Sequence, residues 1–493
     1  MNTLMWFRQD LRLTDNQALT QACKAVTTTA GGSVRAVYFA TPLQWQRHDV
    51  AAIQIDFINR QVNYLGHELA KLGIQLDVIT VADFRAQENA LVEYIEQYDI
   101  DAVYASVEPE WNESLRDKNI VDLLSRGTDS GLTRPCLLHL FDQHCAIAPG
   151  KVTNLSGGMY KVFTPFAKKW RSLALSLPFQ PLPCPSIKLG GRIAVSFTDV
   201  PFELGNHYPQ QVSSQAWAVG ELAASDQLNQ FIASKITLYA QHRDFPAMQF
   251  TSGISPYLAI GMLSPTQCLA AILIQFPDAL VNEASRCKTW INEIIWREFY
   301  RHLLVAFPKL SRNQNFNALG DNIQWRNNLE EFDAWCQGKT GYPIVDAAMT
   351  QLNQTGWMHN RLRMVVASFL TKHLLIDWRW GERYFKQKLI DGDLAANNGG
   401  WQWSAGTGCD AQPYFRVFNP HTQSEKFDPQ AQFIKQYLPQ LQHFSAKAIH
   451  HGELTTVADL FAPDISHYPE MIVDHKAARL RAIEVLGALK KKA

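Results

Sequence analysis

Hydrophobic positions in the first third of the chain follow two different spacings. Short apolar runs, rich in branched and aromatic side chains, predict β-strands at residues 3–7, 34–40, 74–81, 101–107 and 136–141. Between them, residues 54–73 and 83–98 carry apolar side chains at helical spacing. Strands separated by helices pair in parallel, so residues 1–145 predict an α/β domain with a Rossmann-like parallel sheet covered on both faces. No GxGxxG motif follows these strands, so the usual dinucleotide fingerprint is absent from them.

The pattern changes after this domain. Residues 146–236 are irregular and predict an interdomain linker, in which residues 176–191 are rich in proline. Residues 237–493 return to helical spacing and predict an all-α domain. Within it, Ser264 and Pro265 predict the N-cap and first position of a helix. Residues 289–307 and 360–378 predict two long helices.

Length and composition agree with a soluble protein of several domains. The 493 residues exceed the roughly 250–300 at which one core stops growing. The first residues show no signal-peptide pattern, and no apolar run approaches the ~18–20 residues of a membrane span. The eight cysteines form no CxxC pair and no Cys/His cluster with zinc-like spacing. We therefore expect a cytoplasmic protein with no membrane contact, no disulfide framework and no metal.

Charge is unevenly distributed, although the formal net charge is zero. Residues 1–150 contain 12 Lys and Arg against 19 Asp and Glu, and the remainder contains 34 against 27. The carboxy-terminal two-thirds is therefore the side expected to meet a polyanion. A solvated basic face with no partner is the alternative that charge alone leaves open.

Tryptophans concentrate in the helical part, where nine of the fourteen lie between residues 290 and 403. Trp290 and Trp296 are six residues apart, so in a helix they lie on different faces. Trp401 and Trp403 flank Gln402 and cannot share one helix stripe. A flat ligand held between rings and simple packing at a helix junction both remain open.

Polar residues in the segment DGDLAANNGGWQW (391–403) and in GWMHNRLRM (356–364) indicate a binding site. Asn360 and Arg363 share a helix face, and a buried Arg363 needs a carboxylate partner such as Asp391. Asn397 both donates and accepts hydrogen bonds, which suits a heterocycle with ring nitrogens and carbonyls. A hydrogen-bonded loop buried under helices is the alternative.

A second polar segment, YAQHRDFPAMQFTSGIS, spans residues 239–255. Its hydroxyl residues around Gly253 have the chemistry to surround phosphates with hydroxyl and backbone N–H groups. An ordinary Ser/Thr turn with a helix cap has the same sequence pattern, so both interpretations stay open.

Together, these segments resemble the photolyase/cryptochrome family. The similarity includes WFRQDLRLTDNQAL at the start, MYKVFTPF (159–166), WINEIIWREFYRHLL (290–304), GKTGYPIVDAAMTQLNQTGWMHNRLRM (338–364) and DGDLAANNGGWQW. It covers the chain from residue 5 to about residue 474, and three central motifs are long and ungapped. The resemblance is strongest to class I photolyases that repair cyclobutane pyrimidine dimers (CPDs), in the branch with a folate antenna.

The resemblance implies one U-shaped FAD in the helical domain. The residues that match the FAD-binding motifs are Tyr239, Thr251, Ser252, Gly253, Ile254, Ser255, Trp290, Arg297, Trp357, Asn360, Arg363, Asp391, Asp393 and Asn397. By the same match, Asp391 would hold Arg363 against the flavin, Asp393 would bond the ring edge, and Asn397 would lie at flavin N5. Trp401, Trp378 and Trp325 would form an electron path that re-reduces an oxidised flavin.

The reaction implied is light-driven electron transfer from reduced flavin to a dimer flipped out of DNA, which then splits; base flipping by photolyases is a known family property. The implied DNA and lesion contacts are Arg243, Glu293, Trp296, Asn360, Arg361, Met364, Trp403 and Lys426. Arg243, Arg361 and Lys426 would contact phosphates, which position DNA without reading its sequence. UV-damaged DNA is therefore the expected partner, and we expect a monomer.

Two details separate the expected activity from its alternatives. Enzymes for (6-4) lesions resemble WIHHLARH where this chain reads WMHNRLRM, so Asn360 and Met364 replace two histidines. Plant cryptochromes carry Asp at the position of Asn397, and signalling cryptochromes usually have long tails where this chain ends in LKKKA. These features favour CPD repair over a cryptochrome-type blue-light photosensor with the same FAD and Trp chain.

The implied antenna residues are His48, Asn112 and Glu113, all present. Ser311 and Arg312 replace Cys-Lys of close relatives, although Arg312 keeps the charge. The expected antenna is 5,10-methenyltetrahydrofolate, with a deazaflavin as the alternative.

Overall fold

The computed structural model describes residues 1–27, 32–126, 132–186, 195–209, 212–454 and 468–488. The chain forms two compact units. The first comprises Met1–Tyr160, Thr164–Thr237 and Ser252–Pro308, and the second comprises Lys161–Phe163, Leu238–Thr251 and Lys309–Ala493. This grouping places residues 252–308 with the amino-terminal sheet, whereas the predicted domain boundaries lie at residues 145 and 236. Those boundaries stay predictions.

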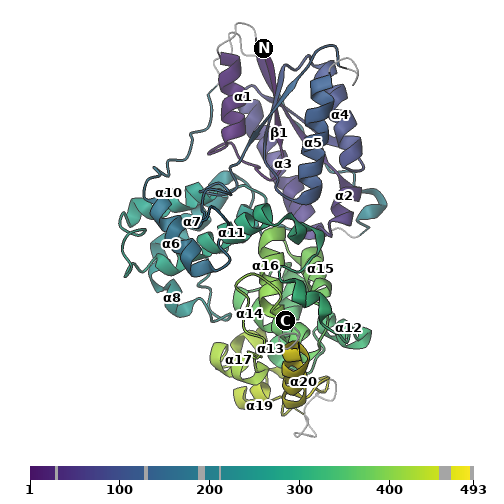
Figure 1. Ribbon diagram of the computed structural model, residues 1–493, viewed down its shortest axis with the longest axis vertical. Coiled ribbons are helices and arrows are strands. Elements are labelled where there is room, and N and C mark those ends of the chain that lie inside the picture. The colour runs from purple at the N-terminus through teal and green to yellow at the C-terminus, as the bar shows by residue number, and fades with distance from the viewer. Residues whose placement is uncertain (28–31, 127–131, 187–194, 210–211, 455–467, 489–493) are drawn as a thin grey trace. The chain divides into compact units, whose positions relative to one another are not determined.

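A five-stranded sheet forms the centre of the first unit (Figure 1). Its strands are β1 (Asn2–Phe7), β2 (Ser33–Ala40), β3 (Gln75–Thr80), β4 (Ala102–Ser106) and β5 (Leu137–Phe141). The strand order is β3-β2-β1-β4-β5, and every neighbouring pair is parallel. All five predicted strands and the α/β class are therefore confirmed.

Helices cover this sheet because strand side chains alternate between its faces. The crossovers are α1 (Gln17–Thr27), α2 (Pro42–Arg47), α3 (Ala52–Lys71), α4 (Phe84–Gln97) and α5 (Trp111–Arg126). On one face, Leu4, Trp6 and Phe39 form a buried core with Leu91 of α4 and Ile120 of α5. Figure 1 shows α1 and α3 on the other side, as right-handed crossovers require.

The other regular elements of the first unit are helices and 3-10 turns, joined by irregular segments. It contains α6 (Phe163–Ala174), the 3-10 turn η2 (Gly205–His207), α7 (Glu221–Ser234), η3 (Ile236–Leu238), α9 (Ser255–Ala259), α10 (Pro265–Gln275) and α11 (Lys288–Ala306). The expected irregular linker is wrong for α6 and α7, whose apolar faces are buried. Residues 187–191 of its proline-rich stretch lie outside the described residues, as does the LKKKA tail. The predicted cap is confirmed, because Ser264 and Gln267 form a capping box.

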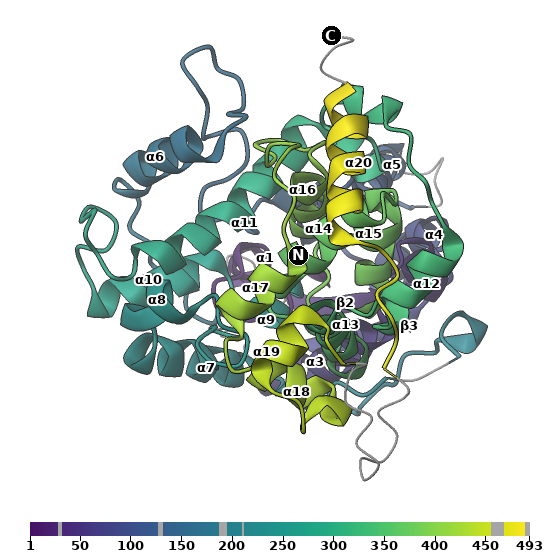
Figure 2. The same ribbon diagram turned by 90° about the horizontal axis from the view of Figure 1, so that it is seen from below.

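All regular elements in the described part of the second unit are helices or helical turns. It contains α8 (Tyr239–His242), the 3-10 turns η4 (Pro308–Arg312), η5 (Ala318–Asn322) and η7 (Pro439–Leu441), α12 (Leu329–Gln337), α13 (Pro343–Thr355), α14 (Asn360–Ser368), the π-helical turn η6 (Phe369–His373), α15 (Trp378–Lys388), α16 (Leu394–Ala405), α17 (Pro420–Phe427), α18 (Gln432–Tyr437), α19 (Ala446–His451) and α20 (His475–Ala488). Figure 2 shows α17, α18 and α19 gathered around α13. None of the described helices combines the length and apolar character that crossing a bilayer requires.

The predicted long helix at residues 360–378 is broken in the structure. α14 ends at Ser368, a π turn follows, and Leu375 adopts a left-handed conformation with φ of 52°. Asp377 then caps α15 by accepting a hydrogen bond from the backbone N–H of Arg379. The break turns the chain so that α14 and α15 both pack on α16.

Candidate functional site

The predicted ion pair between Arg363 and Asp391 is present in the second unit. Nη2 of Arg363 donates to both carboxylate oxygens of Asp391, at 3.1 and 2.8 Å. Nε of Arg363 donates to the carbonyl oxygen of Met358 at 2.8 Å. The Asp391 side chain is only 4% exposed, so the guanidinium neutralises a nearly buried carboxylate and is held in one orientation.

Asp393 and Asn397 lie at the start of α16, Asp393 as its N-cap and Asn397 in its first turn. Asp393 is the N-cap of α16, and its carboxylate accepts from the backbone N–H of Ala396 at 2.9 Å. Nδ2 of Asn397 donates to the carbonyl oxygen of Glu382 at 2.9 Å. This bond fixes the amide so that Oδ1 of Asn397 is the atom presented as an acceptor. The capping role of Asp393 is a local structural role that the sequence analysis missed.

Trp357 supplies a test of whether these residues suit a polar aromatic ligand. Its Nε1 is buried and has no hydrogen-bond partner among the described residues. A buried indole N–H normally finds an acceptor, so a ligand oxygen or ring nitrogen would satisfy it. Asn360, the first residue of α14, is exposed and three residues before Arg363. The set therefore offers donors and acceptors that fit a flavin or an adenine.

The remaining predicted FAD residues divide between the two units. Tyr239 and Thr251 belong to the second unit, where Tyr239 is buried and Cζ of Arg243 lies 5.3 Å from its ring centre. Ser252, Gly253, Ile254 and Ser255 belong to the first, where they lead into α9. Gln227 donates to the carbonyl oxygen of Ser252 at 2.9 Å, and Gly253 has a φ of 66° that favours glycine.

Helix α11 of the first unit carries four predicted site residues, Trp290, Glu293, Trp296 and Arg297. Trp290 is 3% exposed and packs against Phe231, with ring centres 5.5 Å apart. Arg297 donates to the carbonyl oxygens of His144 and Leu258, at 2.8 and 3.3 Å. Glu293 and Trp296 are half-buried and three residues apart, so they share a face. Trp290 is therefore a core residue, whereas Trp296 is only half-buried.

The three tryptophans of the expected electron path all belong to one apolar cluster of the second unit. Trp401 and Trp378 are buried in it, and Trp325 packs against its edge. The Trp401 ring also contacts Trp335 and Phe385, with centres 6.0 and 5.0 Å away. The sequence analysis missed both contacts, because Trp335 and Phe385 lie in other helices. Trp403, two residues after Trp401, is half-buried on a different face of α16.

Arg243, Arg361 and Lys426, the three expected phosphate contacts, lie close together in the second unit. Arg361 donates to Oδ1 of Asp244 at 2.8 Å, and Nε of Arg243 is 3.8 Å from the same oxygen. Arg361 and Lys426 both lie over the ring of Phe427, at 4.4 and 5.2 Å. We call Arg243, Arg361 and Lys426 the basic cluster; with Asp244 included it has a net charge of +2. Met364 is half-buried on α14.

His48, Asn112 and Glu113, the expected antenna residues, meet in the first unit. Nδ1 of His48 is 3.2 Å from Glu113, and Nε2 is 2.8 Å from the amide nitrogen of Asn112. Gln44, which the sequence analysis did not single out, is 2.7 Å from the same Nε2. Burial favours a raised pKa for Glu113, but the hydrogen bond and charge of His48 outweigh it and hold this pKa below its usual range. Burial and the charge of Glu113 raise the pKa of the nearby Glu110 to about 8.

Cys145, Glu298 and His302 form a buried cluster in the first unit that sequence spacing did not reveal. Residues of this kind bind metals, but both Glu298 oxygens already accept hydrogen bonds, from the backbone N–H of Ala146 and Ile147 and from the indole of Trp170. The carboxylate therefore fixes the chain before α6, which is a structural role. The expectation of no metal stays a prediction.

Comparison with known proteins gives matches over the whole chain. Residues 290–488 match the family described as "FAD binding domain of DNA photolyase", and residues 3–186 match the family described as "DNA photolyase". A deoxyribodipyrimidine photo-lyase of Salmonella typhimurium is 46% identical over 490 residues, which are 99% of each chain. Its Escherichia coli counterpart is 44% identical over 490 residues, again 99% of each.

Solved structures give the same result at the level of the fold. A bacterial class III photolyase from Agrobacterium tumefaciens is similar with a TM-score of 0.81 and 36% identity, covering 99% of this chain and 98% of that one. A cryptochrome from Synechocystis is similar with a TM-score of 0.84 and 27% identity, covering 98% and 99%.

Proposed function

Because the chain belongs to the photolyase/cryptochrome family, we propose that it is a deoxyribodipyrimidine photo-lyase that repairs cyclobutane pyrimidine dimers in DNA with FAD and blue light. The observation that carries the proposal is the full-length likeness to proteins of that name, at 44–46% identity. Two features support a flavin-binding role in the second unit: the oriented Arg363–Asp391 pair, and Nε1 of Trp357, which has no hydrogen-bond partner within the described part of the chain.

Bound, reduced FAD would supply the light-driven electron transfer to the lesion. The protein's own task is then to hold and orient the cofactor. Asp391 fixes the Arg363 guanidinium, which presents a positive charge for an anionic ring system. Asn397 presents a carbonyl oxygen set by its bond to Glu382, so it is suited to accept from a ring N–H.

The lesion and its DNA would be held by a different set of residues. We assign Trp296 and Trp403 as rings for the flipped dimer, and Glu293, Asn360 and Met364 as further lesion contacts. The basic cluster is assigned to the phosphates, because its three cations outnumber the single carboxylate of Asp244. Arg361 is already held by Asp244 and Phe427, so Lys426, which is exposed, is the cation best placed to reach a phosphate.

Trp401, Trp378 and Trp325 are proposed to carry electrons from the surface toward the cofactor. Their membership in one apolar cluster supports this order, since Trp401 and Trp378 are buried and Trp325 lies at the edge. The first unit would hold the antenna pigment at His48, Asn112 and Glu113; the side chains of Asn112 and Glu113 are both within hydrogen-bonding distance of the His48 ring. We propose 5,10-methenyltetrahydrofolate, with a deazaflavin as the alternative. A monomeric state and a cytoplasmic location remain predictions from the sequence.

Repair of a defined oligonucleotide tests the proposal. Reduced enzyme is mixed with DNA that carries one thymine CPD, and in parallel with a (6-4) lesion, under blue light and in the dark. We expect light-dependent restoration of the CPD alone. If the protein binds reduced FAD but repairs neither lesion, the alternative function, a blue-light photosensor, is favoured. The similarity to a cryptochrome from Synechocystis agrees with that alternative.

A further inference from the structure

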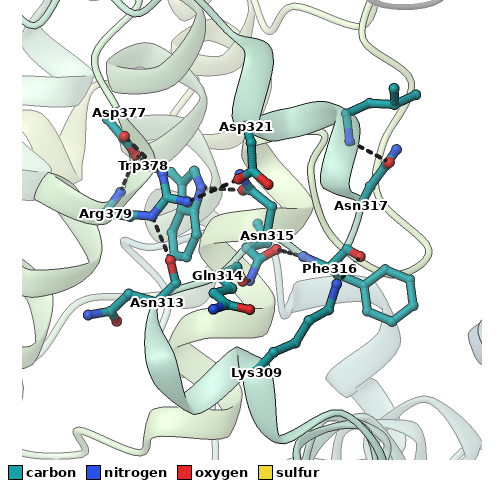
Figure 3. Close-up of polar contacts among 12 residues, drawn as sticks. Lys309, Asn313, Gln314, Asn315, Phe316, Asn317, Asp321, Asp377, Trp378 and Arg379 are labelled. Carbon is teal, nitrogen blue, oxygen red and sulfur yellow. Dashed lines mark hydrogen bonds and ion pairs between the residues drawn. The ribbon is translucent and has the colours of Figure 1, made fainter. Parts of the chain in front are cut away.

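The indole of Trp378 has a single, well-defined hydrogen-bond acceptor. Trp378 opens α15 and is fully buried. Its Nε1–H donates to Oδ1 of Asn315 at 2.9 Å, and Asn315 is itself only 2% exposed. Nδ2 of Asn315 in turn donates to Oδ1 of Asp321 at 2.6 Å, as Figure 3 shows. A chain of two hydrogen bonds therefore connects a buried indole to a carboxylate.

The orientation of the Asn315 amide follows from the chemistry of its neighbours. An indole N–H only donates and a carboxylate only accepts, so Oδ1 must face Trp378 and Nδ2 must face Asp321. Gly320 allows this close approach, because a Cβ there would lie 2.7 Å from Thr407 and 3.0 Å from Cγ of Asn315. The bond to Asp321 polarises the amide and strengthens Oδ1 as an acceptor.

Charges around the indole favour a positive charge on it. Arg379 donates through Nη1 to both oxygens of Asp377, at 3.2 and 3.0 Å, and its Nη2 is 3.7 Å from Asp321. Nε of Arg379 donates to the carbonyl oxygen of Asn313 at 2.7 Å (Figure 3). The guanidinium lies 5.0 Å from the Trp378 ring, and the two carboxylates that pair with it offset its positive charge. The group has a net charge of −1.

We propose that Asn315 is a positioning residue that keeps the Trp378 nitrogen protonated while Trp378 relays electrons. The inference rests on the proposed function of the tryptophan path. In the relay, Trp378 transfers one electron to an oxidised Trp401 and thereby reduces it. The N–H bond of Trp378 is kept, so the indole carries a positive charge until an electron from Trp325 restores it. A soluble thiol then reduces Trp325.

The Trp378 nitrogen keeps its proton because its hydrogen-bond acceptor, Oδ1 of Asn315, is a weak base. An amide oxygen accepts a strong hydrogen bond but binds a proton far less readily than a carboxylate does. Asp321 is the nearest carboxylate in this chain of hydrogen bonds, and the amide of Asn315 separates it from the indole. Loss of the proton would leave a neutral Trp378 radical, and its return to Trp would then need a proton as well as an electron. Asn315 avoids that second requirement.

An exchange of the two side chains tests the proposal at constant charge. Asn315→Asp combined with Asp321→Asn places the carboxylate next to the indole while keeping a donor and an acceptor between the two positions. Transient absorption after a light flash distinguishes the protonated from the neutral tryptophan radical. We expect the protonated radical in the original protein, and its loss in favour of the neutral radical in the exchanged variant. The conversion in the variant should be slower in D2O.

Two control variants separate proton acceptance from a change of charge. Asn317→Asp adds a carboxylate on the same loop, where Asn317 caps η5 and bonds Leu319. Asp321→Asn alone removes the distal carboxylate and leaves the amide at Trp378. Both should keep the protonated radical. Asn315→Leu should shift the Trp378 indole resonance in ¹⁵N-indole-labelled protein in the dark, a readout that is independent of light and repair.

The possible failures are distinguishable. If Trp378→Phe leaves the flash-induced tryptophan radicals unchanged, the proposed relay itself is wrong. If Trp378→Phe abolishes them but the exchanged variant still gives the protonated radical, the relay stands and the role of Asn315 is wrong. An unchanged indole resonance in Asn315→Leu would also remove Asn315 as the acceptor.

Discussion

Single buried residues set the chemistry of the second unit, and Lys372 is the least expected of them. It is fully buried in the π turn η6, where its Nζ donates to the carbonyl oxygen of Arg416 at 2.8 Å. Burial, and then the charge of Arg416, lower the pKa of Lys372 to about 7. An unfolded chain holds this proton up to its ordinary value of 10.5. Above pH 7 the unfolded state therefore binds more protons, and stability increases with pH until about 10.5.

Replacing Lys372 with Met should remove this pH dependence. Between pH 7 and 10.5, each pH unit adds about 1.4 kcal/mol to the free energy of unfolding of the original protein. The difference in free energy of unfolding, Lys372→Met minus original, should therefore be roughly 2–3 kcal/mol smaller at pH 9 than at pH 7. Urea unfolding at both pH values measures the difference. Lys339→Met, at an exposed lysine, is the control and should not alter the trend. If the difference in free energy of unfolding between Lys372→Met and the original protein is the same at both pH values, the lowered pKa of Lys372 is contradicted.

His48 allows a second test at the residue scale. His48→Ala removes the imidazole that links Glu113 and Asn112, so a pigment bound there should be lost while FAD remains. Absorbance of the purified protein, reconstituted with methenyltetrahydrofolate, reports both chromophores separately. Arg47→Ala, at the exposed neighbouring residue, is the matched control. Retention of the folate band in His48→Ala would place the antenna elsewhere.

Sequence chemistry predicted some residue contacts and missed others for a physical reason. Arg363 and Asp391 could be paired in advance, because a buried cation needs a carboxylate. The contact of Asn315 with Trp378 could not, because Asn313, Asn315 and Asn317 have the same chemistry. In the structure, Asn313 gives its carbonyl oxygen to Arg379, and Asn317 caps η5. Only the path of the loop decides which amide faces the indole.

At the scale of elements, apolar spacing located the helices but not the break in them. The apolar pattern continues through residues 369–376 because this turn is buried like the helices beside it. The spacing of apolar residues is therefore the same in a buried π turn as in a buried helix. The left-handed conformation of Leu375 marks where the helical segment ends. The five parallel strands were easier to predict, since each is a short apolar run next to a helix.

Packing of α15 against α16 gives a prediction at this scale. A Cβ on Gly381 of α15 would lie 2.1 Å from Cη2 of Trp401 and 2.6 Å from Cδ2 of Leu370. Gly381→Ala should therefore push α15 away from α16, displace Trp401 and cost about 1–3 kcal/mol of stability. The variant should unfold at a lower urea concentration, and light-driven reduction of its oxidised FAD should be slower. Gly400→Ala is the control, because a Cβ there meets open space; equal effects of the two variants would contradict the packing argument.

Across the whole molecule, the two ends of the sequence differ in charge while the total is zero. Residues 1–150 have seven more acidic than basic side chains, and the remainder has seven more basic than acidic ones. Net charge therefore says little about DNA binding. The local arrangement says more, because Arg361 and Lys426 lie over the ring of Phe427, and Arg243 and Arg361 share Asp244. The sequence indicated which part is basic, but only the fold shows that residues from three separate segments meet there.

Lys426 tests this electrostatic contact with DNA. If Lys426 contacts one phosphate, Lys426→Ala should weaken binding to damaged and undamaged DNA by similar factors, because a phosphate contact carries no lesion information. It should also reduce the slope of log K against log salt by about 1. Binding titrations over a series of salt concentrations measure both effects. Lys71→Ala removes the same charge from α3, which carries none of the proposed DNA contacts, and should leave the slope unchanged. A loss of affinity confined to damaged DNA would instead assign Lys426 to the lesion, and an unchanged slope would remove it from the phosphate contacts.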